Sequence, residues 1–510
     1  MLAIINSFCL KGITGIPVKV EIDINNGLPA YEIVGLVGTA IKESKERVRS
    51  AIKNSLYQYP ISKIIVNLAP ANIKKEGPIY DLAIAMGILA TTGQAEAENL
   101  KDYIVIGELS LNGEVRKVNG VLPILIAARE NGFRKIILPY DNRKEASFIE
   151  GLDIYPVKNL REAVGFVNKE LEIEKIDLNS FEDLRANRNY SYDMKYVKGQ
   201  ALAKRALEIA AAGGHNMLMI GPPGSGKTLL AKCFPSILPD MTFEEALEIT
   251  KIHSVAGVLD IDEGIITTRP FRSPHHTTTT VALTGGGRDA KPGEISLSHN
   301  GVLFLDELPE YTRHTIETLR QPLEDGVITV SRVENTVEYP ANFTMIASMN
   351  PCPCGNYGSR EKECKCTPAV IQKYLNKLSG PLMDRIDMHI EVDSVKYMDL
   401  KTEKLEEDSA SIKSRVDRAR KIQLDRYAGT NIFSNSKMSD TMVKKYCRLS
   451  ESGDAILQEA FDTLGLSARA YNRILKVSRT IADLEGSENI LDEHVIEAIS
   501  YRSLDKKYWN

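Results

Sequence analysis

Hydrophobic and polar positions along the first 167 residues change period several times, which predicts alternating strands and helices. The segments VKVEIDI and KIIVNLAP alternate apolar and polar side chains, as half-buried strands do. Between them, TAIKESKERVRSAIKN places Ile41, Val48 and Ile52 on one helical face, with mixed charges opposite. The alternation then repeats, with DYIVIGEL and RKIILP as strands around the helix LPILIAAREN. The pattern predicts an α+β domain over residues 1–167.

A polar and acidic stretch, residues 168–192, follows this domain and favours a linker. Beyond it, an Ala- and Leu-rich helix ends at Gly213 and Gly214 and leads into the short apolar strand NMLMI. Two further apolar strands, GVLFLDE and FTMIASMN, belong to the same α/β unit, which we assign to residues 193–395. Residues 396–510 are helical in pattern almost throughout, which predicts a third domain made of helices.

The most specific motif is a glycine-rich loop between the strand NMLMI and the next helix. Its sequence, GPPGSGKT, satisfies G-x-x-x-x-G-K-[ST] in the strand–loop–helix context that a phosphate-binding loop requires. Glycines let backbone N–H groups converge on phosphates, and the helix N-terminus adds positive potential. We expect Lys227 to contact the β- and γ-phosphates of ATP and Thr228 to give its hydroxyl to Mg²⁺. The predicted nucleotide-binding residues are Gly221, Pro222, Pro223, Gly224, Ser225, Gly226, Lys227 and Thr228.

Polar residues end the next two apolar strands. Asp306 and Glu307 end GVLFLDE, so that Asp306 is predicted to lie near Mg²⁺ and Glu307 to polarise an attacking water. Two buried carboxylates without a cation nearby would be costly, which argues against a purely structural role. Asn350 ends FTMIASMN and could hold the same water from the other side, although an Asn at a strand end is also a common cap or turn residue.

The chain resembles a known family on these motifs and on further segments. The resemblance rests on the strand end SMNP and on SGPLMDRIDMHIEV, LSARAYNRILKVSRTIADLEG, RPFRSPHHTTTTVALTGGG and KPGEISLSHNGVLFLDELPE. These segments are similar to the magnesium-chelatase-like AAA+ ATPases, and the resemblance to their ComM/YifB subfamily extends nearly end to end. It implies an α/β P-loop core, with a parallel sheet between helices, and a C-terminal helical lid.

The same resemblance implies roles for three more residues. Asn350 corresponds to the sensor that orients the hydrolytic water, Arg385 to the arginine finger and Arg469 to the second sensor on the lid. A finger that acts on the neighbouring subunit's nucleotide implies a ring, a homohexamer. The alternative for Arg385 is a salt bridge with Asp384 or Asp387.

The N-terminal domain resembles the proteolytic domain of Lon-type proteases, which uses a Ser/Lys pair. The similarity rests on VNLAPANIKKEGPIYDLAIAMGIL and IGELSLNGEVRKVNGVLPILIAARENGFRKIILPYDN. A nucleophilic Ser needs a nearby base, and a Lys of lowered pKa can serve. Here the segment after Gly77-Pro78 has no Ser, and Leu122 stands where the Lys would be. We therefore expect a protease-like fold without peptidase activity.

Four of the chain's seven cysteines lie in SMNPCPCGNYGSREKECKCTP, within residues 352–366. Four thiolates can make a tetrahedral Zn²⁺ site in a reducing compartment. The usual zinc spacing is C-x2–4-C, whereas this one is C-x-C-x9-C-x-C, so a packed loop with free thiols is an alternative to structural zinc. The four residues are Cys352, Cys354, Cys364 and Cys366. Because the loop lies between Asn350 and Arg385 in the chain, we expect it to hold the hydrolysis residues in register.

Two insertions could line the pore of a ring. EDGVITVSRVENTVEYPANF predicts a β-hairpin with Arg332 near its tip. RPFRSPHHTTTTVALTGGGRDAKPGE mixes basic groups with flexible backbone, which could follow a nucleic-acid backbone or pack against another subunit. For its two histidines, a turn or interface role is favoured over metal ligation. Its basic residues are Arg269, Arg272, His275, His276, Arg288 and Lys291.

Composition adds limits to these predictions. Of the 510 residues, 43% are hydrophobic and 26% charged, which is typical of a soluble globular protein. Apolar runs are too short to cross a bilayer, and the N-terminus lacks the basic region of a signal peptide, so we expect a cytoplasmic protein without a membrane partner. A formal net charge of −4 gives no overall basic field, so any binding of DNA must come from local loops.

ATP hydrolysis with Mg²⁺ is the predicted activity. The resemblance implies a DNA helicase that drives branch migration in recombination during DNA uptake. Two other functions stay open. A magnesium-chelatase ATPase subunit would lack the extra N-terminal domain, and a protein-remodelling regulator would show an intact protease dyad or an aromatic pore loop.

Overall fold

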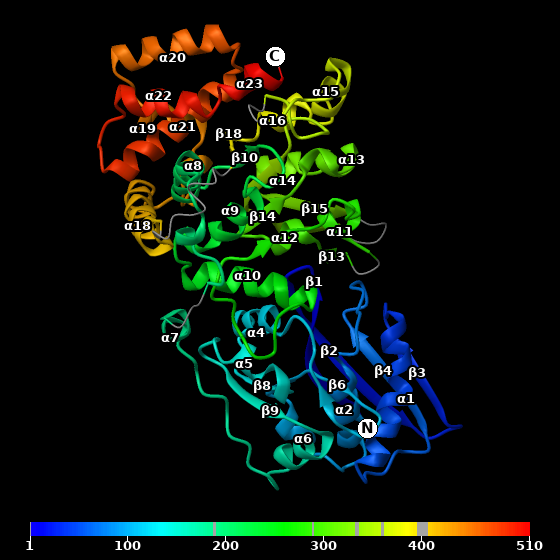
Figure 1. Ribbon diagram of the computed structural model, residues 1–510. Helices are drawn as coiled ribbons and strands as arrows, with labels where there is room; N and C mark the ends of the chain where they lie inside the picture. The colour runs from blue at the N-terminus through cyan, green and yellow to red at the C-terminus, as the bar shows by residue number, and fades with distance from the viewer. Residues whose placement is uncertain are drawn as a thin grey trace.

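The computed structural model describes residues 2–186, 190–287, 290–331, 336–358, 362–394 and 406–509. Figure 1 shows the N-terminal domain in blue to cyan, the P-loop core in green and the C-terminal helices in orange to red at the opposite end of the molecule. Three sequence predictions lie outside the described residues: the position of Arg288, the hairpin tip at Arg332 and the domain boundary between 395 and 396.

In the described chain, seven strands form the N-terminal sheet, in the order β3-β4-β2-β1-β5-β8-β9. The β1–β2 and β2–β4 pairs are antiparallel and the other pairs are parallel. VKVEIDI, KIIVNLAP and RKIILP lie in β2, β4 and β8, as predicted, whereas DYIVIGEL is divided between β5 and β6. The strand bounds are β1 (Leu2–Lys11), β2 (Thr14–Asn25), β3 (Ala30–Val34), β4 (Lys63–Ala69), β5 (Tyr103–Val105), β8 (Lys135–Pro139) and β9 (Asp153–Val157), with a small ribbon of β6 (Glu108–Leu109) and β7 (Val115–Arg116).

Helices cover this sheet and complete one apolar core that runs from Ala3 to Val167. Helix α2 is apolar on all sides and buried, because it packs against β1 and β2 beneath other helices. The predicted helix with Ile41, Val48 and Ile52 on its inner face is α1, and all three side chains are buried. The helices are α1 (Thr39–Asn54), α2 (Asp81–Thr91), α3 (Ala97–Leu100), α4 (Val121–Glu130), α5 (Arg143–Ala146) and α6 (Leu160–Val167).

The predicted linker, residues 168–192, contains a short helix, α7 (Phe181–Ala186). Phe181 is buried beside Phe148 of the N-terminal domain and Met241 of the P-loop core. Its ring centroid lies 5.6 Å from that of Phe243. Phe181 is therefore an apolar contact between the two domains within a segment of polar composition.

The P-loop core is built on five parallel strands among the described residues, in the order β11-β14-β17-β10-β18. Strands β10 and β14 are buried at every residue, as strands of parallel sheets are when helices cover both faces. Strand bounds are β10 (Met217–Ile220), β11 (Phe271–Arg272), β14 (Val302–Leu305), β17 (Thr344–Met349) and β18 (Met388–Glu391), with ribbons of β12 (Gly285–Gly286) with β13 (Lys291–Pro292) and β15 (Val327–Ser331) with β16 (Thr336–Pro340).

The sequence predicts two helices of the core, one before the strand NMLMI and one after GPPGSGKT, and both are present as α8 and α9. The Ala- and Leu-rich helix is α8, which ends at Gly213 with Gly214 in the left-handed conformation that glycine favours. The bounds are α8 (Ala201–Gly213), α9 (Lys227–Cys233), α10 (Phe243–Ala256), α11 (Thr280–Thr284), α12 (Glu294–Leu297), α13 (Arg313–Glu317), α14 (Arg320–Asp325), α15 (Pro368–Leu375) and α16 (Gly380–Met383).

The C-terminal domain is helical, as predicted, and packs on α8 through α18 and α21. Its last helix, α23, returns to the P-loop core beside β18, where the hydroxyl of Tyr508 donates to Glu391. The bounds are α18 (Ser409–Arg426), α19 (Asp440–Tyr446), α20 (Glu451–Leu464), α21 (Ala468–Glu485), α22 (Asp492–Ser500) and α23 (Leu504–Tyr508).

The N-terminal domain contacts the P-loop core at the turn where a Lon-type Lys would stand. The backbone N–H of Gly120 donates to the carbonyl oxygen of Ser254 in α10 at 3.2 Å. The buried Glu145 carboxylate accepts from the Leu122 backbone N–H at 3.0 Å and from the Ser254 hydroxyl. Burial raises the pKa of Glu145. This turn is therefore a contact surface for the P-loop core.

Candidate nucleotide site

The predicted nucleotide residues lie together at the carboxyl edge of the core sheet. GPPGSGKT follows β10, Asp306 follows β14 and Asn350 follows β17, and these three strands are neighbours. The Gly221 N–H donates to the Met349 carbonyl at 3.1 Å, which fixes the loop to the end of β17. In open parallel α/β sheets, this edge is where ligands bind.

The loop conformation explains its glycines. Gly224 and Gly226 have φ of +79° and +89°, which side chains other than glycine rarely adopt. A Cβ at Gly221 would lie 2.1 Å from the Val392 carbonyl oxygen. The backbone can therefore turn toward a phosphate, and Lys227 begins α9 directly after the turn.

Sequence reasoning missed Gln200, which precedes α8. Its side-chain amide donates to the Ser225 carbonyl at 3.2 Å and to the Asp393 carbonyl at 2.6 Å. Gln200 has a φ of +57°, a conformation uncommon outside glycine. It holds the P-loop against the chain that leaves β18, and the sequence gives no sign of this beyond a Gly-Gln pair before a helix.

The Lys227 amine lies at the centre of the loop. It donates to the carbonyl oxygens of Gly221 at 2.8 Å and Pro222 at 2.9 Å, and Asn350 Oδ1 lies 3.4 Å away. Burial lowers the pKa of Lys227, and the nearby carboxylates of Asp306 and Glu307 oppose that shift. The structure therefore brings Lys227 and Asn350 together, as the sequence predicts.

Oxygen atoms suited to Mg²⁺ adjoin the loop. The Thr228 hydroxyl donates to Asp306 Oδ2 at 2.9 Å, and the Ser348 hydroxyl donates to Asp306 Oδ1. Mg²⁺ favours oxygen ligands and is commonly held by one or two side chains together with phosphate oxygens and waters. These residues fit ATP with Mg²⁺.

Glu307 adopts an unusual backbone conformation. Its φ is +51°, in the left-handed region, and its N–H donates to Asp306 Oδ1 at 3.1 Å. Residues other than glycine keep such a conformation where the surrounding structure enforces it, often at functional sites. Its side chain is 52% exposed, so the carboxylate faces the open edge of the sheet, where water has access.

One of the two inserted histidines reaches Glu307. His276 Nδ1 lies 3.8 Å from Glu307 Oε2, and the rings of His275 and His276 lie 4.1 Å apart. His275 Nδ1 contacts the Thr277 hydroxyl at 2.9 Å, in keeping with a turn role. For His276, the predicted turn role is incomplete, because its ring also lies near Glu307. The pairing of β11 with β14 brings the two residues together, and the sequence does not show this pairing.

Arg385 lies near the amino ends of the core strands, whereas this chain's own P-loop lies at their carboxyl ends. Arg385 precedes β18, whose first residue, Met388, pairs with Met217 at the start of β10, whereas the P-loop follows the end of β10. Arg385 donates to Glu324 and to the Pro381 carbonyl, so the alternative pairing with Asp384 or Asp387 is wrong. Asp387 instead pairs with Arg473.

Arg469 lies close to Arg385. Burial lowers the pKa of Arg385, and the charges of Arg469, Arg320 and Arg473 lower it further. The Ser467 hydroxyl, near the start of α21, donates to Asp384 at 3.2 Å, which fixes this end of the helix beside Arg385. The structure thus groups Arg469 with Arg385, and it does not bring either arginine to the P-loop of the same chain.

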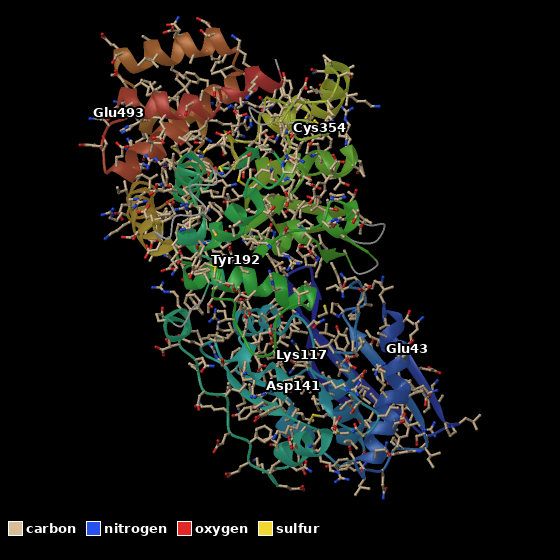
Figure 2. The ribbon with its side chains drawn as sticks, in the orientation of Figure 1. Glu43, Lys117, Asp141, Tyr192, Cys354 and Glu493 are labelled. Carbon is tan, nitrogen blue, oxygen red and sulfur yellow. The ribbon has the colours of Figure 1, made fainter. Side chains whose placement is uncertain are left out.

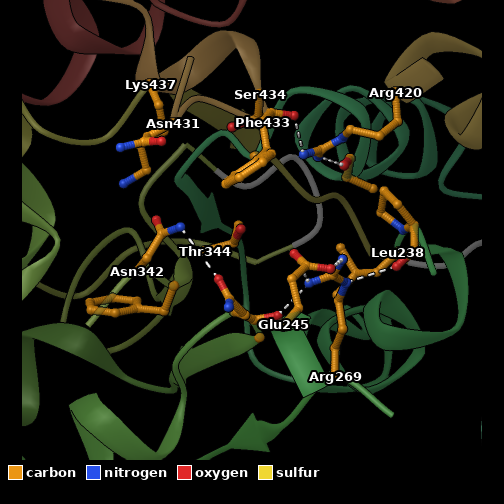
Figure 3. Close-up of a pocket in the computed structure, with 16 residues that line it drawn as sticks. Leu238, Glu245, Arg269, Asn342, Thr344, Arg420, Asn431, Phe433, Ser434 and Lys437 are labelled. Atoms are coloured by element: carbon orange, nitrogen blue, oxygen red, sulfur yellow. Dashed lines mark hydrogen bonds and ion pairs between the residues drawn. The ribbon is translucent and has the colours of Figure 1, made fainter. Parts of the chain in front are cut away.

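Two of the basic residues predicted to be available to nucleic acid are engaged within the chain. Arg269 pairs with Glu245 at 2.9 Å, and Arg272 pairs with Glu294 through two contacts of 2.6 and 2.7 Å. Figure 3 shows Arg269, Glu245 and Thr344 among the residues that line a cavity at the amino ends of the core strands. The cavity has a volume of about 90 Å³. Both arginines are therefore held by ion pairs within the chain, whereas Lys291 is exposed.

Comparison with known proteins decides the family. The model described as magnesium chelatase, subunit ChlI, matches residues 193–400, and its C-terminal counterpart matches 406–502. The competence protein ComM of Haemophilus influenzae is 43% identical over 509 residues, which cover 99% of this chain and 98% of that protein. The chain belongs to the ComM/YifB family of magnesium-chelatase-like AAA+ ATPases.

A second full-length member of the ComM/YifB family, the uncharacterized YifB of Escherichia coli, is 43% identical over 99% of this chain and 98% of its own. Lon protease 1 of Hydrogenovibrio crunogenus is 27% identical over 173 residues, 32% of this chain and 20% of that protein. A model described as subunit ChlI of Mg-chelatase matches residues 20–142. These findings confirm the predicted fold class, an AAA+ core with a helical lid and a Lon-like N-terminal region.

Membership of this family makes the protein an AAA+ ATPase with ATP and Mg²⁺ as cofactors. Among the described residues, we find no helix whose length and apolar character would let it cross a bilayer.

Replacing Lys227 with alanine is expected to weaken ATP binding by about 100-fold, because hydrogen bonds to charged groups contribute roughly 1.5–3 kcal/mol. A fluorescent ATP analogue titrated against the protein measures this. Lys232→Ala is the matched control, since Lys232 is exposed on the same helix and lies over the Tyr192 ring. Unchanged affinity in Lys227→Ala would contradict the predicted role of the loop.

Proposed function

We propose that this protein is a homohexameric motor that hydrolyses ATP to drive branch migration of DNA during recombination, and that it acts in the cytoplasm on DNA taken up by the cell. The full-length similarity to a protein named for competence carries the proposal of DNA as substrate. The position of Arg385 and Arg469, at the edge opposite the P-loop, supports the ring.

A ring lets each subunit complete its neighbour's site. Phosphoryl transfer spreads negative charge over the transferred group, and an arginine supplied by a second subunit stabilises that charge. Glu324, the partner of Arg385, is 54% exposed, so this ion pair can open toward solvent or a neighbouring chain. When the P-loop of a neighbouring subunit approaches, a nucleotide phosphate would replace the Glu324 carboxylate as the partner of Arg385.

Within one subunit, the other site residues have separate roles in nucleotide binding and in hydrolysis. Lys227 and the loop N–H groups would bind the phosphates, and Thr228 and Asp306 would hold Mg²⁺, which would neutralise charge at the phosphate oxygens. Glu307 accepts the proton of the attacking water, and Asn350 orients that water.

We also infer a structural Zn²⁺ held by Cys352, Cys354, Cys364 and Cys366. All four sulfurs lie within 4.8 Å of one another, and three of the separations are 3.4, 3.6 and 3.7 Å. The edge of a tetrahedron with Zn–S bonds of about 2.3 Å is roughly 3.8 Å. The two C-x-C pairs thus converge despite their unusual spacing.

Backbone donors around the four sulfurs also support a thiolate site. The Tyr357 N–H lies 3.3 Å from Cys352 Sγ. Cys354 receives N–H groups of Asn356 and Lys365, and Cys364 and Cys366 each receive one. Such donors stabilise sulfur in its charged form, in which it binds metal.

The presence of the N-terminal domain does not distinguish the DNA-motor hypothesis from the chelatase hypothesis. The family model that matches residues 20–142 is itself described as subunit ChlI of Mg-chelatase. The argument that the extra domain counts against a chelatase therefore loses its force. ComM, the full-length relative with a named role, favours the DNA motor.

The test compares ATPase rates with branched DNA, single-stranded DNA, duplex DNA, a metal-free porphyrin and an unfolded protein at one stated salt concentration. We expect branched DNA to stimulate hydrolysis most, by severalfold, with an effect that falls as salt rises, because phosphate contacts release counterions. Stimulation by the porphyrin or the unfolded protein alone, with no DNA bound, would contradict the DNA motor.

A further inference from the structure

The turn that follows the first cysteine pair touches the P-loop directly. Gly355 has a φ of +79°, and a Cβ at this position would lie 2.4 Å from Cδ and 2.9 Å from Cγ of Pro223. Pro223 is the third residue of GPPGSGKT. We call residues 351–358 and 362–366 the cysteine knuckle. Figure 2 shows Cys354 in this part of the molecule, beside α15 and α16.

The cysteine knuckle is also joined to the strand that carries Asn350. Cys352 follows Asn350 by two residues, and its side chain is fully buried. Tyr374, from α15, packs in the same apolar cluster as Cys352, and its hydroxyl lies near the Asn350 backbone N–H. Since Asn350 Oδ1 lies 3.4 Å from the Lys227 amine, the knuckle supports both walls of the nucleotide site.

The opposite side of the cysteine knuckle rests on the last helix of the chain. The Tyr357 ring centroid lies 6.3 Å from that of Tyr508, and a Cβ at Gly358 would lie 3.6 Å from the Lys507 amine. Lys507 pairs in turn with Glu391 at the end of β18, at 2.7 Å. The knuckle therefore lies between α23 and the P-loop, so we expect a change in its shape to displace Pro223.

We propose that the metal in the cysteine knuckle sets the position of the P-loop, so that zinc loading determines ATP affinity without zinc touching the nucleotide. This rests on the proposed zinc site. Four thiolates around one ion fix the turn that carries Gly355, and the turn fixes Pro223 and the chain after Asn350. Without the ion, the sulfurs repel or protonate and the turn loses its cross-link.

The test uses the full-length protein without DNA. A double variant, Cys364→Ser with Cys366→Ser, removes two ligands and leaves the turn that carries Gly355 unchanged in sequence. We expect elemental analysis to find one zinc per chain in the wild type and none in the variant, and the Kd for a non-hydrolysable ATP analogue to rise about tenfold, or about 1.4 kcal/mol. Cys447→Ala is the control, since Cys447 is buried outside the cluster.

A second variant and a reversible treatment separate the coupling from simple misfolding. Gly355→Ala should keep its zinc and still bind ATP about tenfold more weakly, because the new methyl group would displace Pro223. Wild-type protein stripped by a chelator should lose the same affinity and regain it when zinc is returned. Wild type purified without zinc, or with iron, would overturn the proposal, and so would a zinc-free protein with unchanged ATP affinity. Since no DNA is present, a failure of the DNA motor leaves these results intact.

Discussion

Arg385→Ala is expected to lower kcat for ATP hydrolysis by roughly 10³- to 10⁵-fold while leaving ATP affinity nearly unchanged, as for arginine fingers supplied by a second subunit. Arg385 lies at the amino edge of its own sheet, so its loss cannot affect the P-loop of the same chain directly. A coupled assay of phosphate release, beside a nucleotide titration, measures both quantities.

Two controls test whether the loss of kcat is specific to Arg385. Arg320→Ala removes a neighbouring charge that pairs with Glu317, and we expect kcat to change by only a few fold. Thermal unfolding of Arg385→Ala checks that the variant is folded at the assay temperature, since the Arg385 side chain is only 10% exposed although its partner Glu324 is 54% exposed. Normal hydrolysis by Arg385→Ala would contradict the assigned role.

Glu307→Gln is expected to lower kcat by about 10²- to 10⁴-fold and to retain ATP binding, because an amide keeps the size of the side chain but cannot accept the proton of the attacking water. The backbone contacts of Glu307 with Asp306 and Ser348 remain available to the variant. Single-turnover hydrolysis of bound ATP measures the chemical step alone.

The matched control is Glu310→Gln, since Glu310 lies three residues further on and pairs with Lys377 at 3.6 Å on the surface. We expect its rate to equal the wild type. If Glu307→Gln hydrolysed bound ATP normally, another group would have to act as the base.

The nucleotide edge could be predicted from the sequence because its geometry is local. GPPGSGKT specifies a strand, a turn and a helix within a dozen residues, and apolar strands that end in Asp306 and Asn350 place these groups at one edge of a parallel sheet. Helix α1 and strand β4 were similarly evident from their hydrophobic period.

The arginines show where this local reasoning ends. Arg469 was predicted to be a lid sensor, and its neighbourhood depends on how α21 meets the chain before β18, through Ser467 with Asp384 and Arg473 with Asp387. Arg272 is basic in the sequence, but its partner, Glu294, is 22 residues away. Ion pairs that form only through tertiary packing produce no periodic pattern in the sequence, so they could not be predicted from it.

The cysteines were uncertain for a related reason. A C-x-C pair is an uncommon zinc spacing, and the sequence cannot show that two such pairs meet with sulfur separations of 3.4–3.7 Å. The contact of Gly355 with Pro223 likewise joins segments more than 130 residues apart.

The central claim is that each ATP site is completed by two chains, and mixing two inactive variants tests it most directly. Arg385→Ala retains an intact P-loop, and Lys227→Ala retains an intact Arg385, so a mixed ring contains complete sites. With random 1:1 assembly, about one quarter of the sites pair a working loop with a working arginine, and we expect about a quarter of wild-type ATPase activity from the mixture. Rings shown by a tag on one variant to contain both chains, yet as inactive as either parent, would contradict the account.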